Sequence, residues 1–250
     1  MTHDEKRAFF EKYAAGVVYV EVELPDGNPG IGSAFHVGEG VFVTARHVVE
    51  GCKIVSIAAT ERTTEPDPTT KGARKIVHIG GEATKWSGPF LHPDANVDVA
   101  ALVVEGLDCP TLELGGHLDD WVGSEFVLSS VLLMGYPPVP HTKEPILVVV
   151  SGEVNAVVDL YSCPNARFVV SQMARGGFSG GPAISGYGFV LGVVTDSLVE
   201  GDQSAELGFC SVIAVEPILD CLHHHKIMPR VLREFWQEHD LFNDESPPAE

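Results

Sequence analysis

Short runs of apolar, mostly β-branched and aromatic residues recur from about residue 16 to residue 215, and turn-forming residues separate them. Runs of this length and composition predict β-strands. In the first half they follow one another without helical patterns between them, and the polar stretch 60–72 is expected to be a surface loop. The strands expected in this half are 17–23, 31–37, 41–44, 53–58, 74–79 and 97–104.

A second series of strands is predicted after a connector at 113–124, which contains two adjacent glycines and an acidic pair. Similar strand counts on both sides predict an all-β fold of two β-barrels, because closing a barrel removes exposed strand edges. The strands expected in this half are 126–128, 131–134, 146–150, 152–158, 167–171, 183–185, 189–195 and 208–214.

Both ends of the chain carry apolar residues at helical spacing, such as Phe9 and Tyr13 near the start and Ile218 and Leu222 after the last strand. This spacing predicts a short N-terminal helix and C-terminal helices. The predicted organisation is an N-terminal helix at 1–15, a first barrel at 16–112, the connector at 113–124, a second barrel at 125–215, C-terminal helices at 216–242 and an acidic, mobile tail at 243–250.

The charge balance limits the partners that the chain can have. Its 250 residues include 16 Lys+Arg and 35 Asp+Glu, a formal net charge of −19, and 44% are hydrophobic, which is enough for a packed core. Nucleic acids are not expected partners, because binding them depends on Lys and Arg that neutralise phosphates. No membrane span is expected, because the longest apolar runs, such as 146–150, are far shorter than the roughly 18–20 residues that a span needs.

The N-terminus and the cysteines favour a cytoplasmic location. The first seven residues lack the layout of a signal peptide. The five cysteines are odd in number and never spaced as Cys-x-x-Cys, so neither a disulfide framework nor a zinc site is indicated. The run 223–225 consists of three histidines, but adjacent side chains on a helix point about 100° apart and cannot all face one metal ion.

The strongest chemical signal is Ser179, which has glycines at 176, 177, 180 and 181 around it. A serine crowded by glycines can expose its hydroxyl on a tight turn, and Gly177 can adopt angles that direct consecutive N–H groups at one point. Such a turn is a candidate oxyanion hole. A serine alone is a poor nucleophile and requires a base within hydrogen-bond reach.

His47 and Asp98 are the candidates for that base and for the group that orients it. His47 follows the predicted strand 41–44 at a strand-to-turn junction, and Asp98 is flanked by apolar residues. Burying an unpaired carboxylate is costly, and pairing it with an imidazole N–H removes much of that cost. Asp94, in a polar turn, is the alternative acid, and Asp98 is preferred.

On these residues the chain resembles the chymotrypsin-like (trypsin-like) serine protease superfamily, and in style its bacterial and high-temperature-requirement-type members. The resemblance covers about residues 16–215. It rests on three blocks in the order expected for that superfamily, which are Gly32-Ser33-Ala34-Phe35 leading into Thr44-Ala45-Arg46-His47, then Asp98-Val99-Ala100, then Gly177-Phe178-Ser179-Gly180-Gly181-Pro182.

The resemblance implies an all-β, chymotrypsin-like fold of two six-stranded antiparallel β-barrels. It also implies a serine endopeptidase that needs no cofactor and takes polypeptide substrates. Ser179 would attack the peptide carbonyl, His47 would take and return the proton, and Asp98 would hold His47 in the right tautomer. The backbone N–H groups of Gly177 and Ser179 would stabilise the oxyanion.

The same resemblance implies the residues of the substrate pocket. Thr195 would border the primary specificity pocket and could hydrogen-bond the triad acid, with Asp196, Ser197 and Gly208 along the substrate-facing edge. Met173 stands where the superfamily places the base of the pocket, which argues for a small or medium apolar P1 residue. An ordinary core role for Met173 has equal weight.

Phe178 replaces the aspartate that precedes the nucleophile in digestive and clotting members, so activation by insertion of a new N-terminus is not expected. Control, where it exists, would come from a regulatory protein partner or from loop ordering.

Two alternatives accompany this interpretation. An α/β-hydrolase would need its acid and histidine after Ser179 and a helix directly behind it, whereas 180–182 leads into a strand. The second is a catalytically inactive module that keeps the protease fold and binds peptides by strand addition. A fluorophosphonate probe that reacts with activated serines separates the enzyme from the module.

Overall fold

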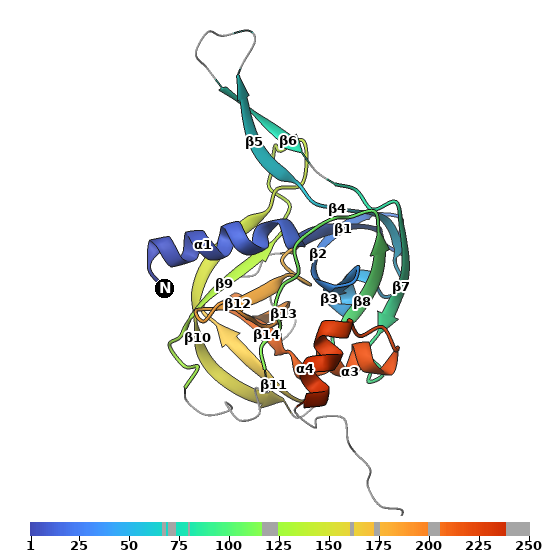
Figure 1. Ribbon diagram of the computed structural model, residues 1–250, viewed down its shortest axis with the longest axis vertical. Helices are drawn as coiled ribbons and strands as arrows, with labels where there is room; N and C mark the ends of the chain where they lie inside the picture. The colour runs from blue at the N-terminus through green and yellow to red at the C-terminus, as the bar shows by residue number, and fades with distance from the viewer. Residues whose placement is uncertain are drawn as a thin grey trace, which may run out of the picture.

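The computed structural model describes residues 1–66, 69, 74–79, 81–116, 125–160, 163–172, 176–199 and 206–238. Two β units lie side by side, with α1 across one of them and α3 and α4 together near the end of the chain (Figure 1). The predicted fold class is confirmed. The domain boundaries stay a prediction, and residues 117–124 of the connector and the tail lie outside the described residues.

The first unit is a six-stranded antiparallel sheet in the order β4-β1-β2-β3-β8-β7. Among the described residues it does not close into a full barrel, and a single bridge from Ala58 to Glu82 extends it beyond β4. Its strands are β1 (Val17–Glu23), β2 (Pro29–Gly38), β3 (Val41–Thr44), β4 (Lys53–Ala58), β7 (Lys85–Leu91) and β8 (Ala100–Glu105).

The second unit is a closed six-stranded barrel in the order β10-β11-β14-β13-β12-β9. All its neighbouring strands are antiparallel. Its strands are β9 (Ser130–Gly135), β10 (Val148–Leu160), β11 (Cys163–Val170), β12 (Pro182–Ser185), β13 (Val190–Val199) and β14 (Glu206–Ala214).

Helices occur at both ends and at one internal turn. Thr2 caps α1 through a capping box with Glu5, which satisfies N–H groups at the start of the helix. None of the helices among the described residues is long and apolar enough to cross a membrane. The helices are α1 (His3–Tyr13), the 3-10 turn η1 (Ala14–Gly16), α2 (Arg46–Val49), α3 (Glu216–His224) and α4 (Arg230–Glu238).

One hydrophobic cluster joins the two β units. It combines Phe35 and Val43 of the first sheet with Leu133 and Val193 of the barrel, and all four are fully buried. A second, smaller cluster of buried hydrophobic residues forms the core of the first β unit. The shared core fixes the two units against each other, so loops from both can hold a common site.

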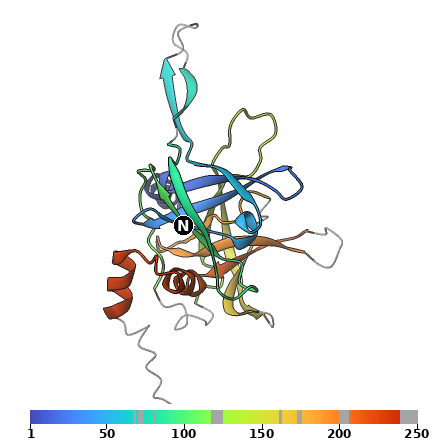
Figure 2. The ribbon, with the colours of Figure 1, turned by 90° about the vertical axis from the view of Figure 1, so that its right-hand side faces the viewer.

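Several strand predictions need correction. Residues of the expected loop 60–72 form β5 (Glu61–Pro66), which pairs with β6 (Arg74–Ile79) in a hairpin that projects from the molecule (Figures 1 and 2). The expected strand 126–128 is a turn in which the Leu128 N–H bonds the Val154 carbonyl at 2.7 Å. The expected strands 146–150 and 152–158 merge into the continuous β10.

Candidate active site

His47 and Asp98 meet through two hydrogen bonds. The imidazole Nδ1 lies 2.7 Å from Asp98 Oδ2, and the backbone N–H of His47 donates to Asp98 Oδ1 at 2.8 Å. His47 belongs to the one-turn helix α2 directly behind β3, and Asp98 lies between β7 and β8. A neutral imidazole that donates from Nδ1 has its lone pair on Nε2, so the geometry selects the tautomer that a general base requires.

The pair lies at the edge of the core, with one member more exposed than the other. The side chain of Asp98 is 19% exposed and that of His47 44% exposed. Val97 and Val99 on either side of Asp98 are buried. The apolar flanks therefore anchor the carboxylate, while the imidazole keeps an accessible surface.

Ser179 lies in the loop between β11 and β12 and is held by both β units. Its carbonyl accepts a hydrogen bond from the Ser33 N–H of the first sheet at 2.8 Å. Its hydroxyl donates to the Thr195 carbonyl of the barrel at 2.7 Å. The nucleophile candidate thus sits at the junction of the two units.

Gly180 brings the Ser179 loop against the start of α2. Its φ is +85°, and a Cβ there would overlap the Ser33 carbonyl oxygen and the Thr44 hydroxyl and lie 3.0 Å from the Ala45 N atom. Only glycine fits these two constraints. Because Ala45 precedes His47 by two residues, this close approach places the Ser179 loop beside the segment that carries the imidazole.

The turn before Ser179 contains a glycine in the left-handed region and two backbone N–H groups with no acceptor in the described part of the chain. Gly177 has a φ of +95°, and its carbonyl accepts from the Ser33 hydroxyl at 2.6 Å and from the Tyr136 N–H at 3.2 Å. Within the described part of the chain, the N–H groups of Gly177 and Ser179 donate to no protein acceptor. Two free donors on one turn can stabilise a negatively charged oxygen.

Ser33 and Tyr136 are supports of this turn that the sequence did not single out as site residues. The Ser33 hydroxyl accepts from the Tyr136 N–H at 2.9 Å, and the Tyr136 hydroxyl donates to the Val17 carbonyl at 3.2 Å. Burial raises the pKa of Tyr136, which keeps its phenol protonated and able to donate. Ser33 lies inside one of the recognised blocks, but only the fold shows that it faces the glycine turn.

The expected substrate-pocket residues lie on two neighbouring strands. Thr195, Asp196 and Ser197 belong to β13 and Gly208 to β14, and the register of the two strands shifts between Val194 and Ser197. Bulges of this kind are common beside active sites. Met173 lies outside the described residues.

The expected hydrogen bond from Thr195 to Asp98 needs correction. Thr195 is fully buried, and its hydroxyl donates to the Ser211 carbonyl on β14 at 3.3 Å. Its side chain bonds within the barrel, while its backbone carbonyl receives the Ser179 hydroxyl. Thr195 therefore contacts the candidate nucleophile rather than the acid.

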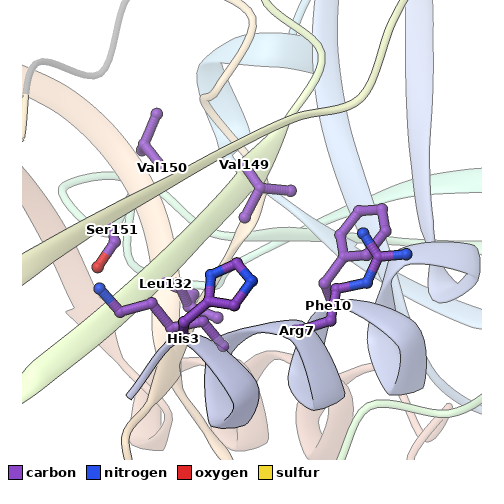
Figure 3. A pocket seen from close by; sticks show the side chains of 8 residues that line it. His3, Arg7, Phe10, Leu132, Val149, Val150 and Ser151 are labelled. Carbon is purple, nitrogen blue, oxygen red and sulfur yellow. The ribbon is translucent and has the colours of Figure 1, made fainter. Parts of the chain in front are cut away.

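A cavity of about 280 Å³ lies elsewhere, between α1 and the strands β9 and β10 (Figure 3). His3 and Phe10 of α1 and Leu132 of β9 are among its lining residues, and none of the predicted site residues lines it. Among the described residues, no three His, Cys, Asp or Glu side chains are grouped so that they could hold a metal ion.

Known proteins resemble this chain in sequence and in fold. The family described as trypsin-like peptidase domain matches residues 32–193. The active form of the Rv3671c protease from M. tuberculosis is similar in structure, with a TM-score of 0.62, 20% identity, and coverage of 89% of this chain and 86% of that chain. No curated protein sequence matches the chain.

Two further solved structures share the fold. The HtrA-type protease AlgW, solved with a tripeptide, has a TM-score of 0.60 and 18% identity over 91% of this chain and 64% of that chain. The serine endoprotease from Yersinia pestis has a TM-score of 0.57 and 16% identity over 91% of this chain and 67% of that chain.

Proposed function

Because the chain belongs to the trypsin-like peptidase family, we propose that it is a serine endopeptidase that hydrolyses peptide bonds through an acyl-enzyme. One observation carries the proposal: both oxygens of Asp98 hold His47, beside a glycine turn that presents the Ser179 hydroxyl. The assigned roles are those of nucleophile for Ser179, general acid–base for His47 and orienting carboxylate for Asp98.

In the first step, the Ser179 hydroxyl turns from the Thr195 carbonyl toward the imidazole, and His47 Nε2 takes its proton as Oγ bonds the peptide carbonyl carbon. The carbonyl oxygen becomes an oxyanion and accepts hydrogen bonds from the N–H groups of Gly177 and Ser179. The C–N bond then breaks, and the imidazolium gives its proton to the leaving amine.

In the second step, water takes the place of the amine. His47 removes a proton from the water while the water oxygen attacks the ester carbonyl carbon. When the ester bond breaks, the imidazolium of His47 gives the proton to Ser179 Oγ. Asp98 stabilises the imidazolium in both steps and stays ionised. Every group in this cycle belongs to the protein, the substrate or water.

The proposed substrate is a polypeptide with a small or medium apolar residue at P1. The preference rests on Met173 at the sequence position assigned to the base of the pocket. The tripeptide bound to AlgW supports a peptide ligand for a protein of this fold.

An unbiased peptide library, read by mass spectrometry, tests the activity and the preference together. We expect cleavage at internal bonds after small or medium apolar residues, and no cleavage by Ser179→Ala. Peptides that bind the wild-type protein but stay intact would instead support the inactive binding module. Cleavage only after Lys or Arg would contradict the assigned pocket.

A further inference from the structure

Arg46, the neighbour of His47, connects α2 to the segment that carries Asp98. Its Nη1 atom donates to the carbonyl of His92 at 3.1 Å and to that of Asp94 at 3.4 Å. Only 14% of its side chain is exposed. The guanidinium thus lies between the two chain segments that supply the candidate base and the candidate acid.

Glu50 sets the orientation of this guanidinium. Arg46 Nε lies 2.9 Å from Glu50 Oε2, and Nη2 lies 2.6 Å from Oε1, so the two side chains pair fork to fork within α2 and its C-cap. A bidentate pair fixes the plane of the guanidinium. The remaining nitrogen, Nη1, is therefore directed at the two carbonyls.

Those carbonyls belong to the turn that leads to Asp98. The Val97 N–H donates to the Asp94 carbonyl at 3.2 Å, and the Asp94 N–H donates to His92 Nδ1 at 3.1 Å. The backbone N–H of His92 donates to the Val99 carbonyl at 3.0 Å. Internal hydrogen bonds therefore hold the segment 92–99 together as one loop, and Arg46 donates to two of its carbonyls.

Helix α3 holds the strand before this unit from another direction. His225 Nε2 lies 2.7 Å from the Leu91 carbonyl, and the Cys221 thiol donates to the Phe90 carbonyl at 3.4 Å. These contacts fix the end of β7. The sheet aligns that end with the start of α2, because Leu91 and Thr44 both pair with Ala100 of β8. Arg46 adds a side-chain link from α2 to the segment 92–99, which follows β7.

Charge acts in the same direction as the hydrogen bonds. The pKa of Arg46 is raised, first by Glu50 and further by the negative charges of Asp98 and Asp94. The guanidinium is therefore a permanent cation in the field of the candidate triad acid.

We propose that Arg46 is a positioning residue of the active site: it joins α2 to the segment 92–99, so that the ring and the backbone N–H of His47 both meet Asp98. This inference rests on the proposed function. Arg46 reaches no reacting atom and acts through the pair that it aligns.

Three variants test it. Arg46→Gln removes the cation and the fork, Arg46→Lys keeps the charge without the fork, and Arg7→Gln is the matched control. Arg7 also pairs with a glutamate four residues later, Glu11, at 2.7 Å, but on the exposed side of α1. The measurements are kcat and KM for one peptide substrate and the NMR resonance of the His47 Nδ1 proton, which reports the bond to Asp98 directly.

We expect Arg46→Gln to lower kcat by about ten- to hundredfold, because small misplacements of catalytic groups cost that much. KM should change by less than about twofold, since Arg46 touches no substrate. The Nδ1 resonance should broaden or move upfield. Arg46→Lys should recover part of kcat, and Arg7→Gln should match the wild type.

A folded Arg46→Gln with wild-type kcat, or with an unchanged Nδ1 resonance, would overturn the inference. If Arg46→Gln does not fold, Arg46→Lys decides by the same two readouts. If the wild type cleaves nothing, the proposed function has failed, but the resonance still shows whether Arg46 aligns the pair.

Discussion

At the scale of single residues, the candidate site depends on residues whose function no other residue type can supply. Asp98 accepts from both the ring and the backbone of His47, which requires two acceptor oxygens on one side chain. Gly177 and Gly180 combine a positive φ with neighbours that leave no space for a Cβ. Both requirements can be tested with variants that differ from a matched control in one property.

Asp98→Asn should fold and lose about 10⁴-fold in kcat, as in other triads. An asparagine replaces one of the two acceptor oxygens by an NH2 group, which donates instead of accepting and leaves the imidazole in the wrong tautomer. Asp94→Asn is the control, because its Oδ1 only accepts from the backbone and side chain of Asn96 and an amide oxygen can do the same. If the two variants exchanged phenotypes, Asp94 would be the triad acid.

Gly180→Ala should lose activity and lower the free energy of unfolding by more than Gly27→Ala does. Both glycines have a positive φ, which costs a residue with a Cβ about 1–2 kcal/mol. Nothing lies within 4 Å of a Cβ at Gly27, whereas at Gly180 it meets Ser33 and Thr44. Urea unfolding of the two variants gives the difference, and equal losses would show that the close approach at Gly180 does not exist.

At the scale of elements, strands far apart in sequence hold the turn before Ser179. The Ser33 hydroxyl of β2 bonds the Gly177 carbonyl, and the Tyr136 N–H just after β9 bonds both groups. These contacts orient the Gly177–Phe178 peptide, which lies between the two proposed oxyanion donors. The turn is thus supported by the first sheet and the barrel together.

Ser33→Ala should lower kcat by about tenfold with little change in KM, because the turn loses a support while its N–H groups remain. Ser56→Ala is a suitable control, since Ser56 is also largely buried and is hydrogen-bonded, to Glu82 at 3.3 Å, but lies on the edge strand β4. Steady-state kinetics on one peptide compare them. An unchanged kcat in Ser33→Ala would show that Ser33 does not support the glycine turn in catalysis.

The sequence was informative where each strand has its own apolar pattern, as in β4 and β6, whose bounds match the prediction. It missed β7 because Ser87, Gly88 and Pro89 interrupt the alternation, although β8 pairs with this strand. It missed β5 because this mostly polar segment has no apolar alternation of its own, although it pairs with β6 in the hairpin. The residues His47, Asp98 and Ser179 could be named from local patterns, whereas Arg46 and Ser33 act through contacts that depend on the fold.

At the scale of the whole molecule, helix α3 contacts β7, the strand before the segment that carries Asp98, through the Cys221 thiol and the Phe90 carbonyl. His92 is 6% exposed, and its Nε2 atom has no hydrogen-bond partner among the described residues. Burial lowers the pKa of His92 and raises the pKa of Asp220 on α3, and the opposite charges of the two groups reduce both shifts. Burial therefore favours a neutral His92, and Asp220 of α3 opposes it only in part.

This arrangement predicts how stability depends on pH. Because the pKa of His92 is lower in the folded protein than in the unfolded chain, the unfolded chain binds more protons at His92 as the pH falls below about 6.5, and the free energy of unfolding falls with it. His92→Asn should reduce that slope by at most about 1.4 kcal/mol per pH unit, because one proton is involved. Urea unfolding at pH 7.5, 6.5 and 5.5 measures it, with exposed His3→Asn as the control. Parallel slopes for wild type and His92→Asn would contradict the prediction.

The proposed function requires that the first sheet and the barrel bring the oriented imidazole of His47 to an activated Ser179. Intact-protein mass spectrometry after treatment with a fluorophosphonate measures this activation directly, because the reagent phosphonylates only a serine whose proton can be removed. We expect one adduct per chain, mapped to Ser179, absent from Ser179→Ala and formed much more slowly in His47→Ala. A folded wild-type protein that stays unmodified, or one modified equally fast without His47, would contradict it.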